Sequence, residues 1–115
     1  MNCPPDCEST LSKLQEMIRK GNRHFVRRNR NGRDYLHQLF ALGLTNIDEA
    51  WNCVLELTIS NYYSGPHYDD KDIERKQGRI IWVYKVNING TTAYIKLKDE
   101  TELRGCVCLS FHEDE

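Results

Sequence analysis

The sequence lacks a long apolar run, and it has no visible internal repeat or low-complexity segment. No stretch approaches the roughly 18 apolar residues that a membrane-spanning helix needs. Residues 1–7 have neither the basic start nor the apolar stretch of a secretory signal. These absences exclude repeat and membrane-spanning proteins, and we expect a soluble, cytoplasmic protein with no membrane partner.

Five cysteines are present, but their number and spacing do not predict a metal site. An odd number in a chain without an export signal favours free thiols. Four of them could in principle hold zinc: Cys3, Cys7, Cys106 and Cys108. Their spacings, however, are Cys-x3-Cys and Cys-x-Cys, whereas common structural zinc sites use paired Cys-x2-Cys. We therefore predict no metal and no other cofactor.

Charge is distributed unevenly along the 115 residues, although the net charge is only -1. Residues 19–33, the basic segment, contain one histidine and no acidic residue, whereas residues 113–115 are all acidic. Such a segment suits an anionic partner such as RNA, because arginine pairs well with phosphate. The alternative is a solvated loop between helices. The predicted RNA-binding residues in this segment are Arg23, Arg27, Arg28 and Arg30.

The first half of the chain has the apolar spacing of helices. Leu11, Leu14 and Ile18 form a stripe that predicts a helix over about residues 8–20. A second helix is expected over residues 34–42, with both Leu39 and Phe40 buried. A third helix is expected to begin at Asn46, because the Asn46 side chain can cap a helix that has Glu49 three residues later. We therefore expect a helical part at residues 8–58, preceded by a flexible terminus at residues 1–7.

The second half changes to the period of strands. Residues 79–87, 91–98 and 106–112 are the predicted strands, and Asn89-Gly90 is a strong signal for the hairpin between the first two. Residues 67–78 are interpreted as a mobile loop. Because helices precede strands, the expected class is α+β: N-terminal helices packed on one face of a C-terminal antiparallel sheet of at least three strands, over residues 79–113. The whole chain, 1–115, is predicted to be a single domain.

Alternation in the last two predicted strands separates a polar face from an apolar one. The polar face would present Tyr94, Lys96, Lys98, Ser110 and His112, and the apolar face Ile95, Leu97, Val107, Leu109 and Phe111. Ile81 and Val83 are expected beneath the helices, which would place Trp82 and Tyr84 on the polar face. A face with lysines and a histidine can bind phosphate and transfer protons near neutral pH. The alternative is an ordinary solvated outer face.

Several short strings occur in an order that resembles the MqsR-type toxins of type II toxin–antitoxin systems, which are ribonucleases with a RelE-like α+β fold. The resemblance covers about residues 10–113. The strings are residues 41–44 (ALGL), 54–57 (VLEL), 62–66 (YYSGP), 81–84 (IWVY), 88–90 (ING), 94–98 (YIKLK) and 109–113 (LSFHE).

This resemblance implies a bacterial endoribonuclease that cleaves mRNA without a metal or small-molecule cofactor, using the 2′-hydroxyl of the RNA. It also implies a cognate antitoxin protein as partner. Tyr94 falls on a tyrosine that the family uses in its site. His112 and Ser64 fall on positions where the best-known branch has lysine, so this chain lacks two cations of that branch.

The residue chemistry adds roles for the remaining candidates. His112 is a better general base near neutral pH than an unshifted lysine. Lys96 is the expected phosphate cation, and His67 is a candidate for the second proton transfer. Lys98, Tyr63 and Ser64 join the arginines as predicted RNA contacts. A non-catalytic RNA- or protein-binding module with the same fold is the alternative function, because a fold does not determine an activity.

Overall fold

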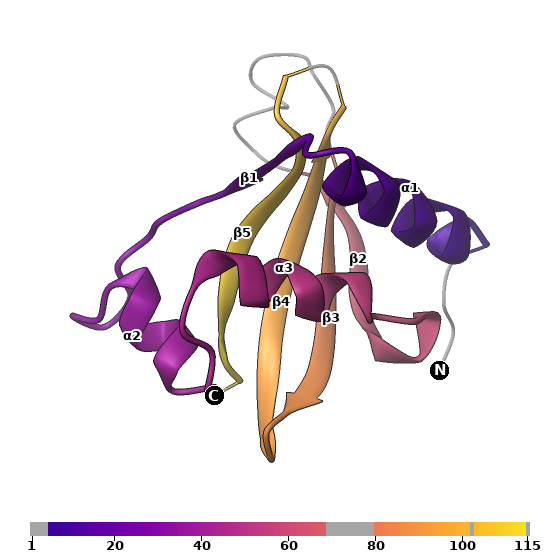
Figure 1. Cartoon of the computed structure of the whole chain (residues 1–115). Coiled ribbons are helices and arrows are strands. Elements are labelled where there is room, and N and C mark those ends of the chain that lie inside the picture. Colours follow the sequence, from indigo (N-terminus) through magenta and orange to yellow (C-terminus); the bar gives the residue numbers. More distant parts are fainter. Residues whose placement is uncertain (1–4, 69–79, 102, 115) are drawn as a thin grey trace.

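The computed structural model describes residues 5–68, 80–101 and 103–114 (Figure 1). Its elements are α1 (Cys7–Arg19), β1 (Arg23–Phe25), α2 (Tyr35–Phe40), α3 (Ile47–Leu55), a 3-10 turn (Ile59–Asn61), β2 (Tyr62–Tyr68), β3 (Ile80–Ile88), β4 (Thr91–Glu100) and β5 (Gly105–Glu113). Figure 1 shows the three helices on one side of the sheet. None of the described helices is long and apolar enough to cross a membrane.

The sheet has five strands in the order β1-β5-β4-β3-β2. The α+β class is confirmed, and β3, β4 and β5 form the expected antiparallel core. The sheet as a whole is mixed, however, because β1 pairs with β5 in parallel. β1 was not foreseen because three residues are too few to show a strand period. β2 was also missed, since it contains Pro66, which strands tolerate mainly at sheet edges.

Side-chain caps begin two of the helices: the cap of α3 was expected, and the cap of α2 was not. The Asp34 carboxylate accepts the His37 backbone N–H at 2.9 Å, and the Asn46 side chain accepts the N–H of Glu49 at 2.9 Å. Burial of Phe40 was wrongly predicted, since its side chain is 53% exposed. Leu39 faces the core, and the next residue of a helix is turned away by roughly 100°.

The Asn89-Gly90 turn is confirmed, and it determines which face of β3 is covered. Ile88 pairs with Thr91 across the turn, so Trp82 lies opposite Leu97 and Tyr84 lies opposite Ile95. Directly opposed residues share a face, and both aromatic side chains are fully buried in the helix-covered core. The prediction that they lie on the polar face was therefore wrong. Residues 80–84 are continuously apolar, so their alternation could not decide the face.

A β-bulge in β5 changes the predicted alternation. Lys96 pairs with Ser110 while Leu97 pairs with Cys108, which leaves Leu109 as an extra residue. Beyond the bulge, His112 and Phe111 keep their expected faces. Before it the faces are exchanged: Cys106 and Cys108 belong to the helix-covered core, while Val107 does not.

The cysteines of the described chain differ in whether they are bonded. Cys53, Cys106 and Cys108 are free thiols, as expected, whereas Cys7 is disulfide-bonded, which the sequence did not predict. Burial raises the pKa of the Cys106 thiol to about 12. A thiol of that kind remains protonated at neutral pH and is a poor metal ligand.

Candidate functional site

The face of the sheet opposite the helices brings three predicted site residues together. Tyr94 of β4 is directly paired with His112 of β5, and Lys96 is paired with Ser110 in the next row. On its other side, Tyr94 is paired with Lys85 of β3. The expectation that Tyr94, Lys96 and His112 share a face is therefore confirmed. The Tyr94 and His112 rings are stacked, with centroids 5.1 Å apart and planes at 14°.

His112 is held in a defined orientation. Only 7% of the residue is exposed, and its Nδ1–H donates to the backbone oxygen of Glu113 at 2.7 Å. A carbonyl oxygen can only accept, so this hydrogen bond requires the proton on Nδ1. In the neutral ring, Nε2 is then left with a free lone pair. That is the tautomer that a general base needs.

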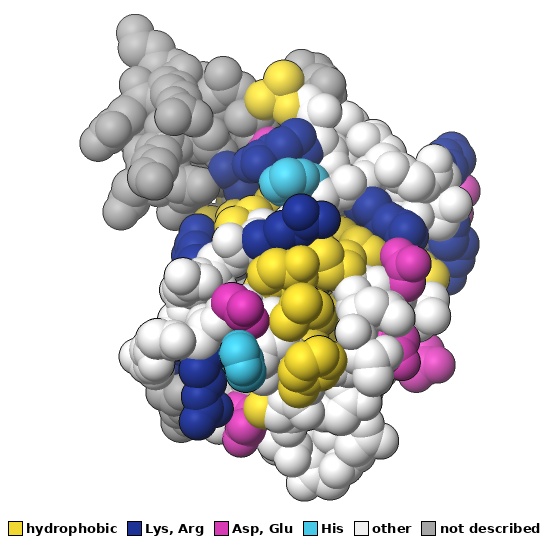
Figure 2. All heavy atoms as spheres, turned by 60° about the vertical axis from the view of Figure 1, so that its left-hand side comes forward, with side chains coloured by type: hydrophobic (Ala, Val, Ile, Leu, Met, Phe, Trp, Pro, Cys, Tyr) yellow, Lys and Arg dark blue, Asp and Glu magenta, His cyan; other side chains and the backbone are white. Residues whose placement is uncertain are grey.

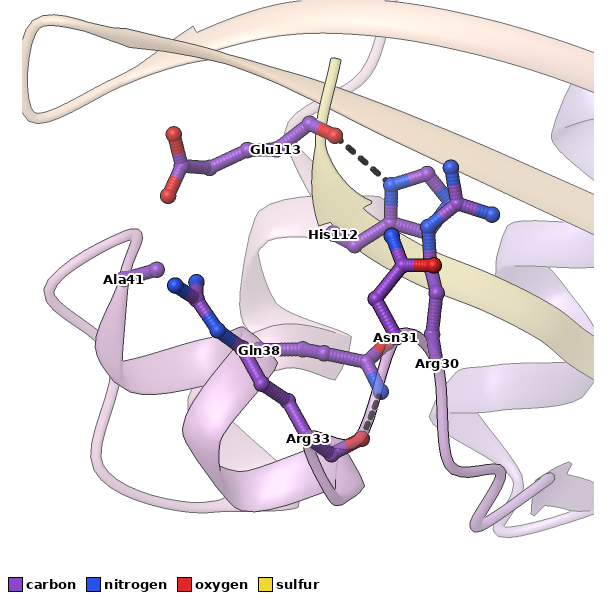
Figure 3. A pocket seen from close by; sticks show the side chains of 7 residues that line it. All are labelled: Arg30, Asn31, Arg33, Gln38, Ala41, His112 and Glu113. Carbon is purple, nitrogen blue, oxygen red and sulfur yellow. Dashed lines mark hydrogen bonds between the residues drawn. The ribbon is translucent and has the colours of Figure 1, made fainter. Parts of the chain in front are cut away.

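A pocket of about 360 Å³ opens beside this histidine. It is lined by Arg30, Asn31, Arg33, Gln38, Ala41, His112 and Glu113 (Figure 3). Figure 3 shows the Arg30 and Asn31 side chains directed at the His112 ring, while the Glu113 carboxylate points away from it. The pocket therefore combines an imidazole with guanidinium groups, which suits an anionic ligand.

Hydrogen bonds hold this part of the basic segment in place. The Gln38 side-chain amide donates to the backbone oxygens of Arg28 and Arg33, at 2.8 and 3.0 Å. The backbones of Arg30 and Arg33 are bonded to each other across a tight turn. The turn itself is Asn31-Gly32, with positive φ at both residues. The sequence analysis missed this feature, although Asn-Gly is the same turn signal that identified the β3–β4 hairpin.

Lys85 is a cation on the face of the sheet opposite the helices, here called the open face, and the sequence analysis did not single it out. Its Nζ lies 2.9 Å from the Asp114 carboxylate and 3.7 Å from the centre of the Tyr63 ring. The hydrogen bond to Asp114 raises the pKa of the Lys85 ammonium above its ordinary value. The two-residue turn at Asn89-Gly90 could have identified it, because that register places Lys85 opposite Tyr94.

Lys98 lies on the same strand as the site but is engaged elsewhere. It is only 5% exposed, and its ammonium lies 3.0 Å from Glu100, which also accepts two hydrogen bonds of 2.9 Å from Arg104. The hydrogen bonds from Arg104, then those from Lys98, lower the pKa of Glu100 to about 2. Lys98 is thus part of an ion cluster around the buried Glu100, whereas Lys96 is half-buried beside the site.

The candidates on β2 lie apart from His112. His67 is within 3.0 Å of the Ser64 hydroxyl and pairs with Ile81 at the edge of the sheet. Three strand spacings separate β2 from β5, which is roughly 15 Å across the sheet. The structure therefore does not bring His67 and His112 to one phosphodiester.

The predicted RNA-binding arginines are all exposed: Arg23, Arg27, Arg28 and Arg30. Asp69, Asp70, Asp72 and Glu74 could pair with these arginines in a purely structural role, but they lie outside the described part of the chain. Within the described residues, no cluster of three or more His, Cys, Asp or Glu side chains could hold a metal ion.

The chain is thus a small α+β protein in which a histidine and two arginines line one pocket. No family model matches the chain, and neither the curated proteins nor the solved structures include a match.

Proposed function

We propose that the protein is a metal-independent endoribonuclease that cleaves mRNA by attack of the 2′-hydroxyl on the adjacent phosphorus. The observation that carries this proposal is the orientation of His112. Its Nδ1–H is committed to the Glu113 carbonyl, so the Nε2 lone pair is free beside a pocket that Arg30 and Arg33 line. A base and cations in one hollow are the minimum that this chemistry needs.

In the proposed reaction, His112 Nε2 removes the proton of the 2′-hydroxyl. The 2′-oxygen bonds to phosphorus while the bond from phosphorus to the 5′-oxygen breaks. The products are a 2′,3′-cyclic phosphate and a 5′-hydroxyl, whose proton comes from water in the open pocket. Arg30 in the pocket offsets the charge of the phosphorane, and Lys96 adds positive charge from the next row of the sheet. Tyr94 holds the plane of the imidazole.

The proposal extends to a toxin of the MqsR type with a RelE-like fold, acting on mRNA in a bacterial cytoplasm and inhibited by a cognate antitoxin. Its supports are the order of the short motifs and the pairing of Tyr94 with His112. Expression of the chain should then arrest growth, and His112→Ala should relieve the arrest. An equal arrest by both chains would contradict the toxin proposal.

A non-catalytic RNA-binding module is the second candidate. It is favoured by the low exposure of His112 and by its hydrogen bond to backbone. In that case the imidazole would be a structural group, and the pocket would hold RNA without cleaving it.

Cleavage of a labelled RNA in the presence of EDTA distinguishes the two candidates. His112→Ala should lower the rate by about two to four orders of magnitude, the usual range for one acid–base group, and should change RNA affinity little. The product should carry a cyclic phosphate. The matched control is His37→Ala, since this side chain is 69% exposed and does not line the pocket. Undiminished cleavage by the His112 variant would exclude His112 as the base, and an inactive wild-type protein that binds RNA would identify the binding module.

A further inference from the structure

A second hollow lies at the outer edge of β1, where the basic segment begins. This edge groove has a volume of about 600 Å³ and is lined by Arg23, His24, Phe25, Val26, Arg27, Ile47, Asp48, Trp51 and Arg104. Figure 2 shows this side of the molecule, where Lys and Arg side chains form a band with a histidine among them, above a hydrophobic patch. The groove therefore combines positive charge with aromatic and aliphatic walls.

The edge groove and the His112 pocket each share lining residues with a third hollow. A smaller hollow of about 150 Å³ shares Phe25 and Val26 with the groove, and it shares Arg30 and His112 with the pocket. His24 pairs with Val107, which lies four regular strand steps and one bulge residue from His112. The two histidines are thus roughly 14 Å apart, more than one internucleotide step.

Two guanidinium groups in the groove are pre-positioned on aromatic rings. Arg27 lies 5.6 Å from the centre of the Tyr35 ring, and Arg23 lies 5.8 Å from that of Trp51. Arg27 makes no ion pair within the described part of the chain. A guanidinium fixed in this way loses less side-chain entropy when it binds a phosphate or stacks on a base.

The acidic groups of the groove do not cancel this charge. Asp48 is 3.5 Å from Arg23, but its side chain is 83% exposed, so solvent screens the pair. Glu100 neutralises Arg104 instead. Arg27 is therefore the cation whose contribution to ligand binding can be isolated.

We propose that the edge groove is a second RNA subsite, which holds single-stranded RNA more than one nucleotide away from the bond at His112. This inference rests on the proposed function, because it assumes that the same RNA strand occupies the pocket. The smaller hollow, whose lining includes Phe25, Val26 and Arg28–Arg30, would lead the strand from the groove to the pocket. The subsite would bind phosphates through arginine and would have little preference for sequence.

The test is the dependence of binding on RNA length, measured by fluorescence anisotropy with 2′-O-methyl RNA, which cannot be cleaved. Arg27→Gln should weaken binding of a decanucleotide about tenfold and lower the salt slope by about 0.7, as expected for one lost phosphate contact. Binding of a dinucleotide, which fills only the His112 pocket, should not change. Asp48→Asn should strengthen decanucleotide binding, since it removes the exposed negative charge.

The matched control is Arg19→Gln, which removes the same charge from an exposed position of α1 outside the groove. The inference would be overturned if Arg27→Gln weakened both lengths equally, or weakened the decanucleotide no more than the control does. Equal competition by polyglutamate and RNA would assign the groove to an acidic peptide instead. Because the RNA is uncleavable, this result does not depend on whether the protein is a nuclease, which the EDTA assay decides separately.

Discussion

At the scale of single residues, the site depends on how one imidazole is held. The Glu113 carbonyl determines which nitrogen of His112 carries the proton, and the Tyr94 ring determines the plane of the imidazole. Neither contact involves a charged partner. The chain therefore orients this imidazole without an ion pair.

Tyr94 provides a test of the stacking contribution. Tyr94→Phe keeps the ring and should lower the cleavage rate less than threefold, whereas Tyr94→Ala removes the stack and should lower it by roughly 10- to 100-fold. Single-turnover rates at saturating RNA measure this difference. If the phenylalanine variant were as slow as the alanine variant, the hydroxyl rather than the stack would be the contributing group.

Glu100 should make stability depend on pH in the acid range. Its pKa is about 2 in the folded protein and near 4.5 when unfolded, so its contribution is complete above pH 4.5 and is lost as the pH falls from about 4.5 toward 2. The difference corresponds to at most about 3 kcal/mol. Urea unfolding at pH 7, 4 and 3 should show this loss in the wild type and in the exposed control Glu16→Gln, but a smaller one in Glu100→Gln. Parallel pH profiles for all three proteins would contradict this assignment.

At the scale of elements, the bulge in β5 lets one strand serve two environments. It places Cys106 and Cys108 in the core at one end of the strand, and it still places Phe111 in the core and His112 on the open face at the other. A regular strand could not satisfy both halves with this sequence, because the side-chain period is two.

Deletion of Leu109 tests the role of the bulge. Without the extra residue, either the cysteines or the Phe111–His112 pair must exchange faces. We expect a loss of at least about 2 kcal/mol in the free energy of unfolding, because a polar ring is buried or a large apolar one is exposed. Leu109→Ala is the control, since it removes a half-buried side chain and keeps the residue count. Equal unfolding free energies for the two variants, measured in urea, would show that the bulge is dispensable.

At the scale of the whole molecule, the sequence predicted the helices, the β3–β4 hairpin and the shared face of Tyr94, Lys96 and His112 from local signals. It did not predict that β1 completes the sheet, because parallel pairing between distant segments leaves no local pattern. The pocket was missed for the same reason: Arg30 was identified for its charge, but its position beside His112 depends on Gln38 and on the path of the loop over α2. In a continuously apolar strand segment, alternation alone does not show which side chains face the core. The register of the adjoining turn is needed as well.

The parallel pairing of β1 with β5 has a consequence for synthesis on the ribosome. Residues 23–25 are synthesised well before their partners at 106–108 and the histidine at 112. The nascent chain therefore contains neither the complete sheet nor the pocket, and contacts of such long sequence separation form slowly. The pocket around His112 can thus form only after β5 has been synthesised.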